Sequence, residues 1–396
     1  MSRLSIAVVG AGIGGLTSAL ALAGQGHEIT IFERRTGFGE AGAGIQLSPN
    51  ASRVLIELGL GLVLKRLASE PSRIVVRDLG SGKQIAAIAL GAFASQRFGT
   101  PYWFVSRQDL HTALLDAVRA RGNIRLRVGR TLTGITQRDE RVELAFEAAG
   151  GAADAATADL VVAADGIWSR ARASLGDGRE PLSSGFVAYR STIARADAPA
   201  ALGDNEGGLW LGPGRHVVHY PIAGGRLLNV VAVEKREDRL AEWSAPVDPA
   251  RVRSAFAGAA APVAELLAAA PEWSAWSLHD LPAQRMASGR TALLGDAAHP
   301  ALPFVAQGGA MAIEDAAQLA AEIARLPDDP SGALRAYEKA RLPRVKRVQS
   351  AARKNARIYH AGGPVRLARN LVMRRLGPEG MSERYGWVYD WRLAPT

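Results

Sequence analysis

Four residues near the amino terminus have the types and spacing that hold a dinucleotide. Gly10, Gly12 and Gly15 match the pattern G-x-G-x-x-G, and Glu33 follows eighteen positions after the third glycine. In this pattern the first glycine permits a tight turn, the second lets the backbone approach a pyrophosphate, and the third brings a helix close to a strand. A carboxylate at the position of Glu33 accepts hydrogen bonds from ribose hydroxyls. The motif does not distinguish NAD, NADP and FAD, because all three cofactors contain the ADP half that it would bind.

The surrounding residues predict the strand, helix and strand that must position these groups. The run 4–9 is apolar and rich in β-branched residues, as in a strand buried on both faces of a parallel sheet. Residues 16–23 favour a helix ending at Gly24, whose N-terminus offers unpaired N–H groups to a phosphate. Residues 28–32 predict the second strand. Glycines also make ordinary turns, but this order of elements favours nucleotide binding.

Two further carboxylates follow predicted strands. The apolar run 160–164 ends at Asp165 and Gly166, and the run 291–294 is followed closely by Asp296. Open α/β sheets bind ligands at the carboxyl ends of their strands. We therefore expect both carboxylates to face the same ligand as the glycine motif.

Two histidines, His216 and His219, lie among short alternating runs between residues 186 and 233, which predict an antiparallel sheet. Residues i and i+4 of a strand share a face, whereas i and i+3 do not. His216 and Tyr220 are thus expected to point one way and His219 the other. The two histidines make a poor metal site, and we predict no bound metal. The alternative reading of His216 is a structural histidine in the core.

Composition narrows the class of protein. A length of 396 residues suggests two domains, and 48% hydrophobic with 22% charged residues is ordinary for a globular enzyme. The absence of cysteine excludes disulfides, thiolate catalysis and iron–sulfur ligation by the chain. No apolar stretch is long enough to span a bilayer, and the first residues lead directly into a strand, so we expect no membrane partner, no signal peptide and a cytoplasmic location.

The net charge of +10 is concentrated in one segment. Residues 331–376 contain thirteen Lys or Arg and a single acid, Glu338, so the remainder of the chain is close to neutral. This distribution favours a solvated helix face or a subunit contact over a nucleic-acid partner. The field of the segment is also suited to attracting acidic substrates.

The pattern of elements predicts an α/β chain with two domains. The expected boundaries are 1–72, 98–180 and 281–360 for a Rossmann-like domain, 73–97 and 181–280 for a substrate domain on an antiparallel sheet, and 361–396 for a helical, aromatic tail packed on the first domain. Local expectations are a glycine-rich stretch near the ligand at 37–45, a helix over 50–60 capped by Asn50, a loop over 148–158 and a helix over 248–267.

Taken in order, the three motifs resemble those of single-component FAD-dependent aromatic hydroxylases. The resemblance extends over nearly the whole chain. It rests on the glycine motif with Glu33, on Asp165-Gly166 and on the run Gly295-Asp296-Ala-Ala-His-Pro300. The stretches at 42–45 and 306–309 are similar to the branch containing salicylate hydroxylase, 3-hydroxybenzoate 6-hydroxylase and 6-hydroxynicotinate 3-monooxygenase. The resemblance implies a Rossmann-like FAD-binding domain of the para-hydroxybenzoate hydroxylase type.

The resemblance also implies roles for individual residues. The residues expected to hold FAD are Gly10, Gly12, Gly15, Glu33, Arg34, Gly44, Arg107, Asp165, Gly166, Asp296, Gly308 and Gly309, with Asp165 and Gly166 also serving the transient nicotinamide cofactor. His216 and Tyr220 are the expected catalytic and substrate-binding residues, Pro300 faces the flavin ring, and Phe304 contacts the substrate.

The implied reaction uses NADH or NADPH to reduce FAD, which with O2 forms a C4a-hydroperoxide that hydroxylates a small phenolic or acidic aromatic. The apolar run 301–305 departs from relatives with a polar residue there, which admits a larger or less polar ring. Two alternatives stay open: an FAD-dependent dehydrogenase or reductase without oxygen insertion, and a non-enzymatic flavin-binding protein. The expected assembly is a monomer or a homodimer.

Overall fold

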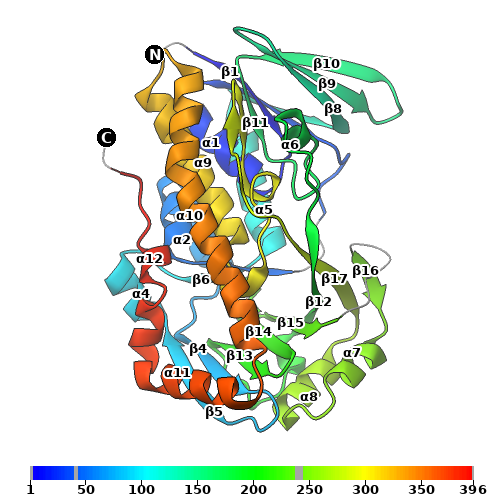
Figure 1. The fold of residues 1–396 in the computed structure, drawn as a ribbon, viewed down its shortest axis with the longest axis vertical. Coiled ribbons are helices and arrows are strands. Elements are labelled where there is room, and N and C mark those ends of the chain that lie inside the picture. Colours follow the sequence, from blue (N-terminus) through cyan, green and yellow to red (C-terminus); the bar gives the residue numbers. More distant parts are fainter. Residues whose placement is uncertain (1–2, 40–42, 237–243, 395–396) are drawn as a thin grey trace.

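The computed structural model describes residues 3–39, 43–236 and 244–394. Two large sheets lie toward opposite ends of an elongated molecule, and one long helix, α10 (Pro330–Tyr359), runs along both (Figure 1). Part of the glycine-rich stretch expected near the ligand, residues 40–42, lies outside the described residues. The described part contains no helix long and apolar enough to cross a membrane.

The first sheet has six strands in the order β18-β19-β11-β1-β2-β7, and only β18 runs antiparallel to its neighbour. Its strands are β1 (Ser5–Val9), β2 (Glu28–Glu33), β7 (Ile124–Val128), β11 (Leu160–Ala163), β18 (Ala287–Ser288) and β19 (Thr291–Leu293). The predicted order of strand, helix and strand at the amino terminus is confirmed. The ends of β1, β11 and β19 meet at one edge because these strands are parallel.

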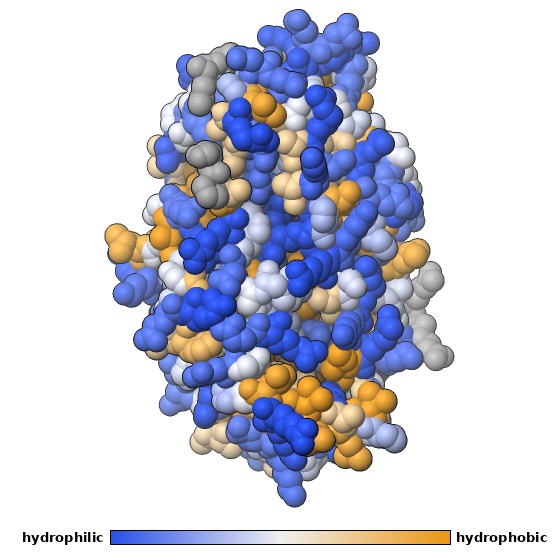
Figure 2. Space-filling model, turned by 60° about the vertical axis from the view of Figure 1, so that its left-hand side comes forward, coloured by the Kyte–Doolittle hydropathy of each residue, from blue (hydrophilic) through white to orange (hydrophobic). Residues whose placement is uncertain are grey.

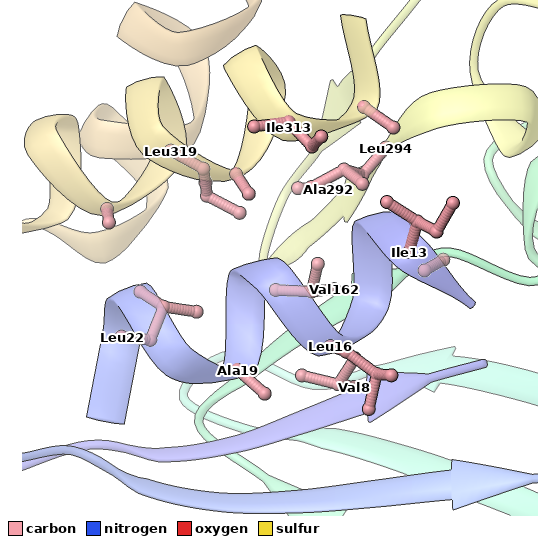
Figure 3. Packing of buried hydrophobic residues seen from close by; sticks show 14 of the residues in the cluster. Val8, Ile13, Leu16, Ala19, Leu22, Val162, Ala292, Leu294, Ile313 and Leu319 are labelled. Carbon is pink, nitrogen blue, oxygen red and sulfur yellow. The ribbon is translucent and has the colours of Figure 1, made fainter. Parts of the chain in front are cut away.

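Helix α1 (Ile13–Ala23) lies between this sheet and α9 (Gly308–Arg325), as Figure 3 shows. Leu16 of α1 packs toward Val8 of β1, while Ile313 and Leu319 of α9 cover the other side of α1. A Cβ on Gly14 would lie 2.5 Å from a methyl carbon of Leu294. The same Cβ would lie 3.1 Å from the Cβ of Ala312 on α9, so this glycine lets α1 pack closely on both the segment after β19 and α9.

A separate three-stranded sheet, β10-β9-β8, covers part of the first domain. Its strands are β8 (Arg130–Gln137), β9 (Val142–Ala148) and β10 (Ala153–Ala158). The loop expected over 148–158 is wrong for β10, which forms a complete antiparallel ladder with β9. Backbone hydrogen bonds hold this alanine-rich strand although its side chains bury little surface, and a stacked Phe32–Phe146 pair, 4.4 Å apart, docks the sheet.

The second large sheet has eight strands in the order β16-β17-β12-β15-β14-β13-β4-β5, all antiparallel except the β13–β4 pair. Its strands are β4 (Arg73–Asp78), β5 (Gln84–Ala89), β12 (Leu182–Ala194), β13 (Glu206–Gly212), β14 (Arg215–Ile222), β15 (Leu227–Lys235), β16 (Ser244–Val247) and β17 (Trp273–Asp280). The single helix expected over 248–267 is wrong: α7 (Pro249–Ala255) and α8 (Ala261–Ala269) are separated at Gly258, whose φ of +78° a helix does not allow.

The remaining elements join or cover these sheets. They are β3 (Gly44–Leu47), α2 (Pro49–Glu57), α3 (Gly61–Leu67), α4 (Gly91–Phe98), β6 (Trp103–Ser106), α5 (Arg107–Arg119), α6 (Arg170–Ser174), α11 (Gly363–Glu383) and α12 (Gly386–Tyr389). Helix α11 packs on β5, and Tyr389 of α12 packs edge-to-face on Phe98 at 5.4 Å. The tail thus lies on the second sheet as well, beyond the first domain on which it was expected; the domain boundaries stay our proposal.

Candidate functional site

The glycine turn between β1 and α1 has the geometry of a phosphate cradle. A Cβ on Gly10, whose φ is +101°, would collide with the carbonyl oxygen of Ala164, and a Cβ on Gly15 would collide with that of Gly10. Gly12 differs, because it has an ordinary φ of −76° and a Cβ there would meet nothing within 4 Å. The first and third glycines are therefore required by the fold, whereas the second leaves space beside the uncapped start of α1.

The carboxylate of Glu33 is buried and oriented by the backbone. One oxygen accepts a hydrogen bond from the N–H of Ala11 at 2.8 Å, and the other accepts from the N–H of Arg35 at 2.9 Å. Each oxygen keeps further lone pairs, so the carboxylate retains the capacity to accept ribose hydroxyls.

One cavity of about 610 Å³ connects this turn to the second sheet. Its wall includes eight of the predicted cofactor residues: Gly10, Gly12, Glu33, Arg34, Arg107, Asp165, Gly166 and Asp296. Arg190 and Trp276, which the sequence did not single out, also line it. The long shape suits an extended dinucleotide whose ring end reaches the second sheet. The predicted cofactor residues Gly15, Gly44, Gly308 and Gly309 are not on this wall, and neither are the predicted substrate residues His216, Tyr220 and Phe304.

Asp165 stands at the carboxyl end of β11 with one oxygen in use and one spare. Its Oδ2 accepts hydrogen bonds from the N–H groups of Arg170 and Ala171, 2.9 and 3.2 Å away, which caps α6. Its Oδ1 is buried and has no partner within the described residues. Burial raises the pKa of this carboxyl. A buried acceptor beside a cavity fits a ligand with hydroxyl groups, such as the ribityl or ribose portion of FAD.

Asp296 is exposed on the cavity wall, and a network of buried charged side chains holds the turn on which it lies. Gly295, with φ +61°, donates its N–H to Asp315 on α9 at 3.0 Å. His299 and Arg341 hydrogen-bond to the same carboxylate at 2.6 and 2.7 Å, and all three side chains are fully buried. Burial alone would raise the pKa of Asp315, but His299 and Arg341 outweigh it and lower the pKa to about 2.

The start of α9 is held by a second buried network. Gln307 accepts a hydrogen bond from Asn50 and donates one to Ser48, and Asn50 also donates to Glu314. Asn50 therefore lies inside α2 and braces α9, which corrects its expected role as a helix cap. A Cβ on Gly309 would lie 2.6 Å from Ile45, so this glycine lets β3 approach the helix.

His216 and Tyr220 share one face of β14, as the strand period predicts, and the structure shows that this face looks toward the first domain. His216 packs on Phe304, with ring centres 5.5 Å apart, and Tyr220 packs on Phe104 at 4.7 Å. His219 lies on the opposite face against Trp210 at 6.3 Å. The two histidines do not converge, and no group of three metal-binding side chains occurs within residues 3–39, 43–236 and 244–394.

His216 is almost fully buried, and its Nδ1 lies 2.9 Å from Nε2 of His360 at the end of α10. Burial, and then His360, hold the pKa of His216 well below its usual range. Tyr220 is also buried, which raises its pKa. Gly44 belongs to this environment, because a Cβ there would lie 2.6 Å from the Tyr220 ring.

Some of the residues after Asp296 line the cavity, and others pack inside the fold. Ala301 and Pro303 lie on the cavity wall, whereas the Pro300 carbonyl accepts a hydrogen bond from Gln349 at 2.8 Å. Phe304 packs in the cluster around His216. Pro303 therefore lines the cavity and Pro300 does not, while the expected contact of Pro300 with the flavin ring stays a prediction.

Arg190 of β12 is a site residue that the sequence did not reveal. Its guanidinium lies 5.0 Å from the ring of Trp276 on the cavity wall, and no described carboxylate forms an ion pair with it. Burial, and then neighbouring Arg107, lower its pKa to about 10. An arginine in a strand normally faces solvent, so the sequence offered no reason to assign Arg190 to the site. Only the three-dimensional structure shows that it lines the cavity.

Comparison with known proteins extends these observations. A family model described as an FAD binding domain matches residues 3–352. The chain is 38% identical to 3-amino-4-hydroxybenzoate 2-monooxygenase of Streptomyces platensis, covering 100% of this chain and 98% of the relative. It is 37% identical to 3-hydroxybenzoate 6-hydroxylase 1 of Aquipseudomonas alcaligenes, covering 97% of each. Its fold is similar to that of salicylate hydroxylase in complex with its substrate, with a TM-score of 0.83 and 26% identity over 99% of this chain and 96% of the other.

The resemblance first suggested by three short motifs is therefore confirmed over the whole chain. The matched relatives are named as a monooxygenase and a hydroxylase, the family model is that of an FAD binding domain, and the cradle, the spare oxygen of Asp165 and the cavity fit FAD. Since both the family model and full-length relatives agree, this chain belongs to the FAD-dependent aromatic hydroxylases.

Proposed function

We propose that this hydroxylase acts on a phenol that also carries an anionic group, in the manner of a hydroxybenzoate. The observation that carries the proposal is Arg190, a cavity cation without an ion-pair partner in the described part of the chain. A carboxylate on the ring would provide that partner, and Arg binds carboxylates through two parallel hydrogen bonds. The printed names of two relatives, a 3-amino-4-hydroxybenzoate monooxygenase and a 3-hydroxybenzoate hydroxylase, support the same class.

His216 is the proposed base and Tyr220 its neighbour on the same strand face. The lowered pKa of His216 keeps its imidazole neutral at pH 7, so it has a nitrogen lone pair for the phenol proton. Ionisation makes the phenol ring a better nucleophile toward the oxygen that reduced FAD activates. Phe304 would then form an apolar wall that keeps water from the substrate. This wall is compatible with rings larger than benzoate.

FAD would be held by the glycine turn, Glu33, Asp165 and Asp296, and would supply the oxygen-activating chemistry when bound and reduced. Asp165 and Gly166 remain our proposal for the nicotinamide contact. The chain offers one glycine fingerprint, and NADH is the proposed reductant by analogy with the branch. A cytoplasmic location is likewise proposed.

We propose a homodimer formed through α11. Five large aliphatic side chains of this helix are 39–68% exposed: Val365, Leu367, Leu371, Val372 and Leu376. Apolar side chains gather near this lower end of the molecule in Figure 2. Monomers rarely expose so many large aliphatic side chains together, and a second copy related by a two-fold axis would cover them.

The substrate class is tested by measuring NADH oxidation and hydroxylated product with hydroxybenzoates, hydroxynicotinates and larger phenols. We expect a hydroxybenzoate to stimulate NADH oxidation and to yield product. Arg190→Met should raise KM for the acid by about tenfold or more, and leave KM for its methyl ester unchanged.

Arg77→Met is the matched control, because Arg77 stacks on Trp210 at 5.5 Å on the opposite sheet face. Equal effects of Arg190→Met on acid and ester would rule out the proposed contact. Failure of every phenol to yield product would rule out the substrate class.

A further inference from the structure

His360 stands where the end of α10 meets the second sheet. Its Nδ1 lies 2.6 Å from the carbonyl oxygen of Ala356, and its Nε2 lies 2.9 Å from Nδ1 of His216. The ring is held between partners, since Phe186 stacks on it at 4.6 Å with an interplanar angle of 28°. Both hydrogen-bonding nitrogens of His360 are therefore in use, and its orientation is constrained.

The direction of each hydrogen bond follows from the chemistry of its partners. A carbonyl oxygen only accepts, so Nδ1 of His360 must carry a proton and donate to Ala356. In a neutral imidazole the other nitrogen, Nε2, then has a lone pair and accepts. Nδ1 of His216 must therefore be the donor of the 2.9 Å bond. It follows that Nε2 of neutral His216 has no proton and is free to accept one.

The surroundings keep His360 neutral. Burial lowers its pKa, the Ala356 carbonyl partly opposes this, and nearby Arg369 lowers it further. Arg369 donates hydrogen bonds to the carbonyls of Ile358 and Tyr359, which fixes its charge close to the pair of histidines. The other titratable groups near His216 are Tyr359, 5.7 Å away between ring centres, and Tyr220 on the same strand face. No described carboxylate hydrogen-bonds to either histidine ring.

We infer that His360 is a positioning residue that fixes His216 in the tautomer able to take a proton at Nε2. This inference rests on the proposed role of His216 as the base. When the phenol O–H bond breaks, the proton forms a new bond to Nε2 of His216, and the electron pair stays on the phenolate oxygen. Nδ1 of His216 keeps its proton throughout and continues to donate to His360.

The tautomer is directly observable in holoenzyme labelled with ¹⁵N-histidine. The chain has seven histidines, and long-range ¹H–¹⁵N correlations distinguish protonated from unprotonated ring nitrogens. We expect Nδ1 of His216 to be protonated and Nε2 unprotonated at pH 7.5, with His216→Asn identifying the signal. His360→Gln, whose amide can place an oxygen near the former Nε2, should preserve this pattern, whereas His360→Leu should give a mixture of tautomers. A protonated Nε2 in the wild type, or an unchanged pattern in His360→Leu, would overturn the inference.

Kinetics with 3-hydroxybenzoate as the probe, or the best acid from the panel above, separate this inference from the proposed function. His360→Leu should lower kcat by about tenfold with KM changed less than about threefold, and His360→Gln should restore kcat. A substrate fluorinated at both positions beside the phenol hydroxyl has a lower phenol pKa, and its turnover should be less sensitive to His360→Leu. If His216→Asn leaves kcat unchanged, the proposed base is wrong while the tautomer result still stands. If His216→Asn is slow and His360→Leu is not, only the role of His360 is wrong.

Discussion

Oδ2 of Asp315, inside α9, accepts a hydrogen bond from the backbone N–H of Gly295 at 3.0 Å. A buried carboxylate therefore holds the turn that presents Asp296 to the cavity. Asp315 is in turn paired with Arg341 of α10, which also binds Glu314 at 2.6 Å. Arg341 and Arg344 of α10 are thus used inside the fold, whereas most of the other basic side chains of this helix are exposed.

Arg341→Met should be strongly destabilising. It would leave Glu314 and Asp315 without their common buried cation, and removing one partner of such a group costs about 3–5 kcal/mol. The measurement is the free energy of unfolding by urea. Arg335→Met is the control, because its ion pair with Asp329 is largely exposed and should contribute less than about 1 kcal/mol. Similar losses in both variants would contradict the role given to Arg341.

Gly12→Val should fold and yet lose FAD. The backbone at Gly12 accepts a side chain, and a Cβ meets no protein atom within 4 Å, so the valine would occupy only the space of the pyrophosphate. We expect colourless protein with an unchanged thermal midpoint. Gly122→Val is the control, since Gly122 also has open space around its Cβ position but lies away from the cavity. Yellow Gly12→Val protein with one FAD per chain would refute the cradle.

His219→Leu should remove part of the acid sensitivity of the fold. Burial lowers the pKa of His219 to about 3, and neither ring nitrogen has a partner in the described structure. The unfolded chain, with a pKa near 6.5, binds more protons, so this residue lowers stability as pH falls below about 6.5, by about 2 kcal/mol at pH 5.

The free energy of unfolding of the wild type and of His219→Leu should thus be close at pH 7.5 and diverge toward pH 5. His27→Leu provides the contrast at pH 7.5, because Nδ1 of His27 accepts the N–H of Leu4 at 3.3 Å and the loss of this hydrogen bond should destabilise the protein there. Parallel pH curves for wild type and His219→Leu would show that His219 is not the group responsible.

Leu371→Glu should convert the proposed homodimer to a monomer. Leu371 is 54% exposed among the aliphatic side chains of α11, and a charge there would be buried by a second copy. Light scattering after size-exclusion chromatography gives the mass. Leu62→Glu is the control, since Leu62 is 82% exposed on α3, away from this face. A wild-type mass of 41.8 kDa would refute the dimer.

The local parts of the site were predictable because short-range rules determine them. The positive φ of Gly10 and the contact between Gly15 and the Gly10 carbonyl are consequences of one tight turn, which the glycine spacing encodes directly. Alternation along β14 likewise separated His216 from His219 without knowledge of neighbouring strands.

Features that depend on distant segments could not be read in this way. His216 and His360 are 144 residues apart, and nothing in their spacing links them. Asn50 looked like a helix cap because its partners, Gln307 and Glu314, lie more than 250 positions away. Residues 153–158 looked like a loop because their propensity for strand is low, and only pairing with β9 makes them one.

Helix α10 also determines the distance between Arg341 and His360. Arg341 binds the Asp315 carboxylate, which holds the turn at Gly295, and His360 contacts the proposed base His216. The two residues lie nineteen positions apart along α10 and its C-terminal end. At about 1.5 Å per residue, the helix separates the two contacts by roughly 28 Å. One inserted residue between them would shift His360 by about 1.5 Å and rotate it by about 100° around the axis. The helix therefore serves as a spacer whose surface side chains can vary but whose length cannot.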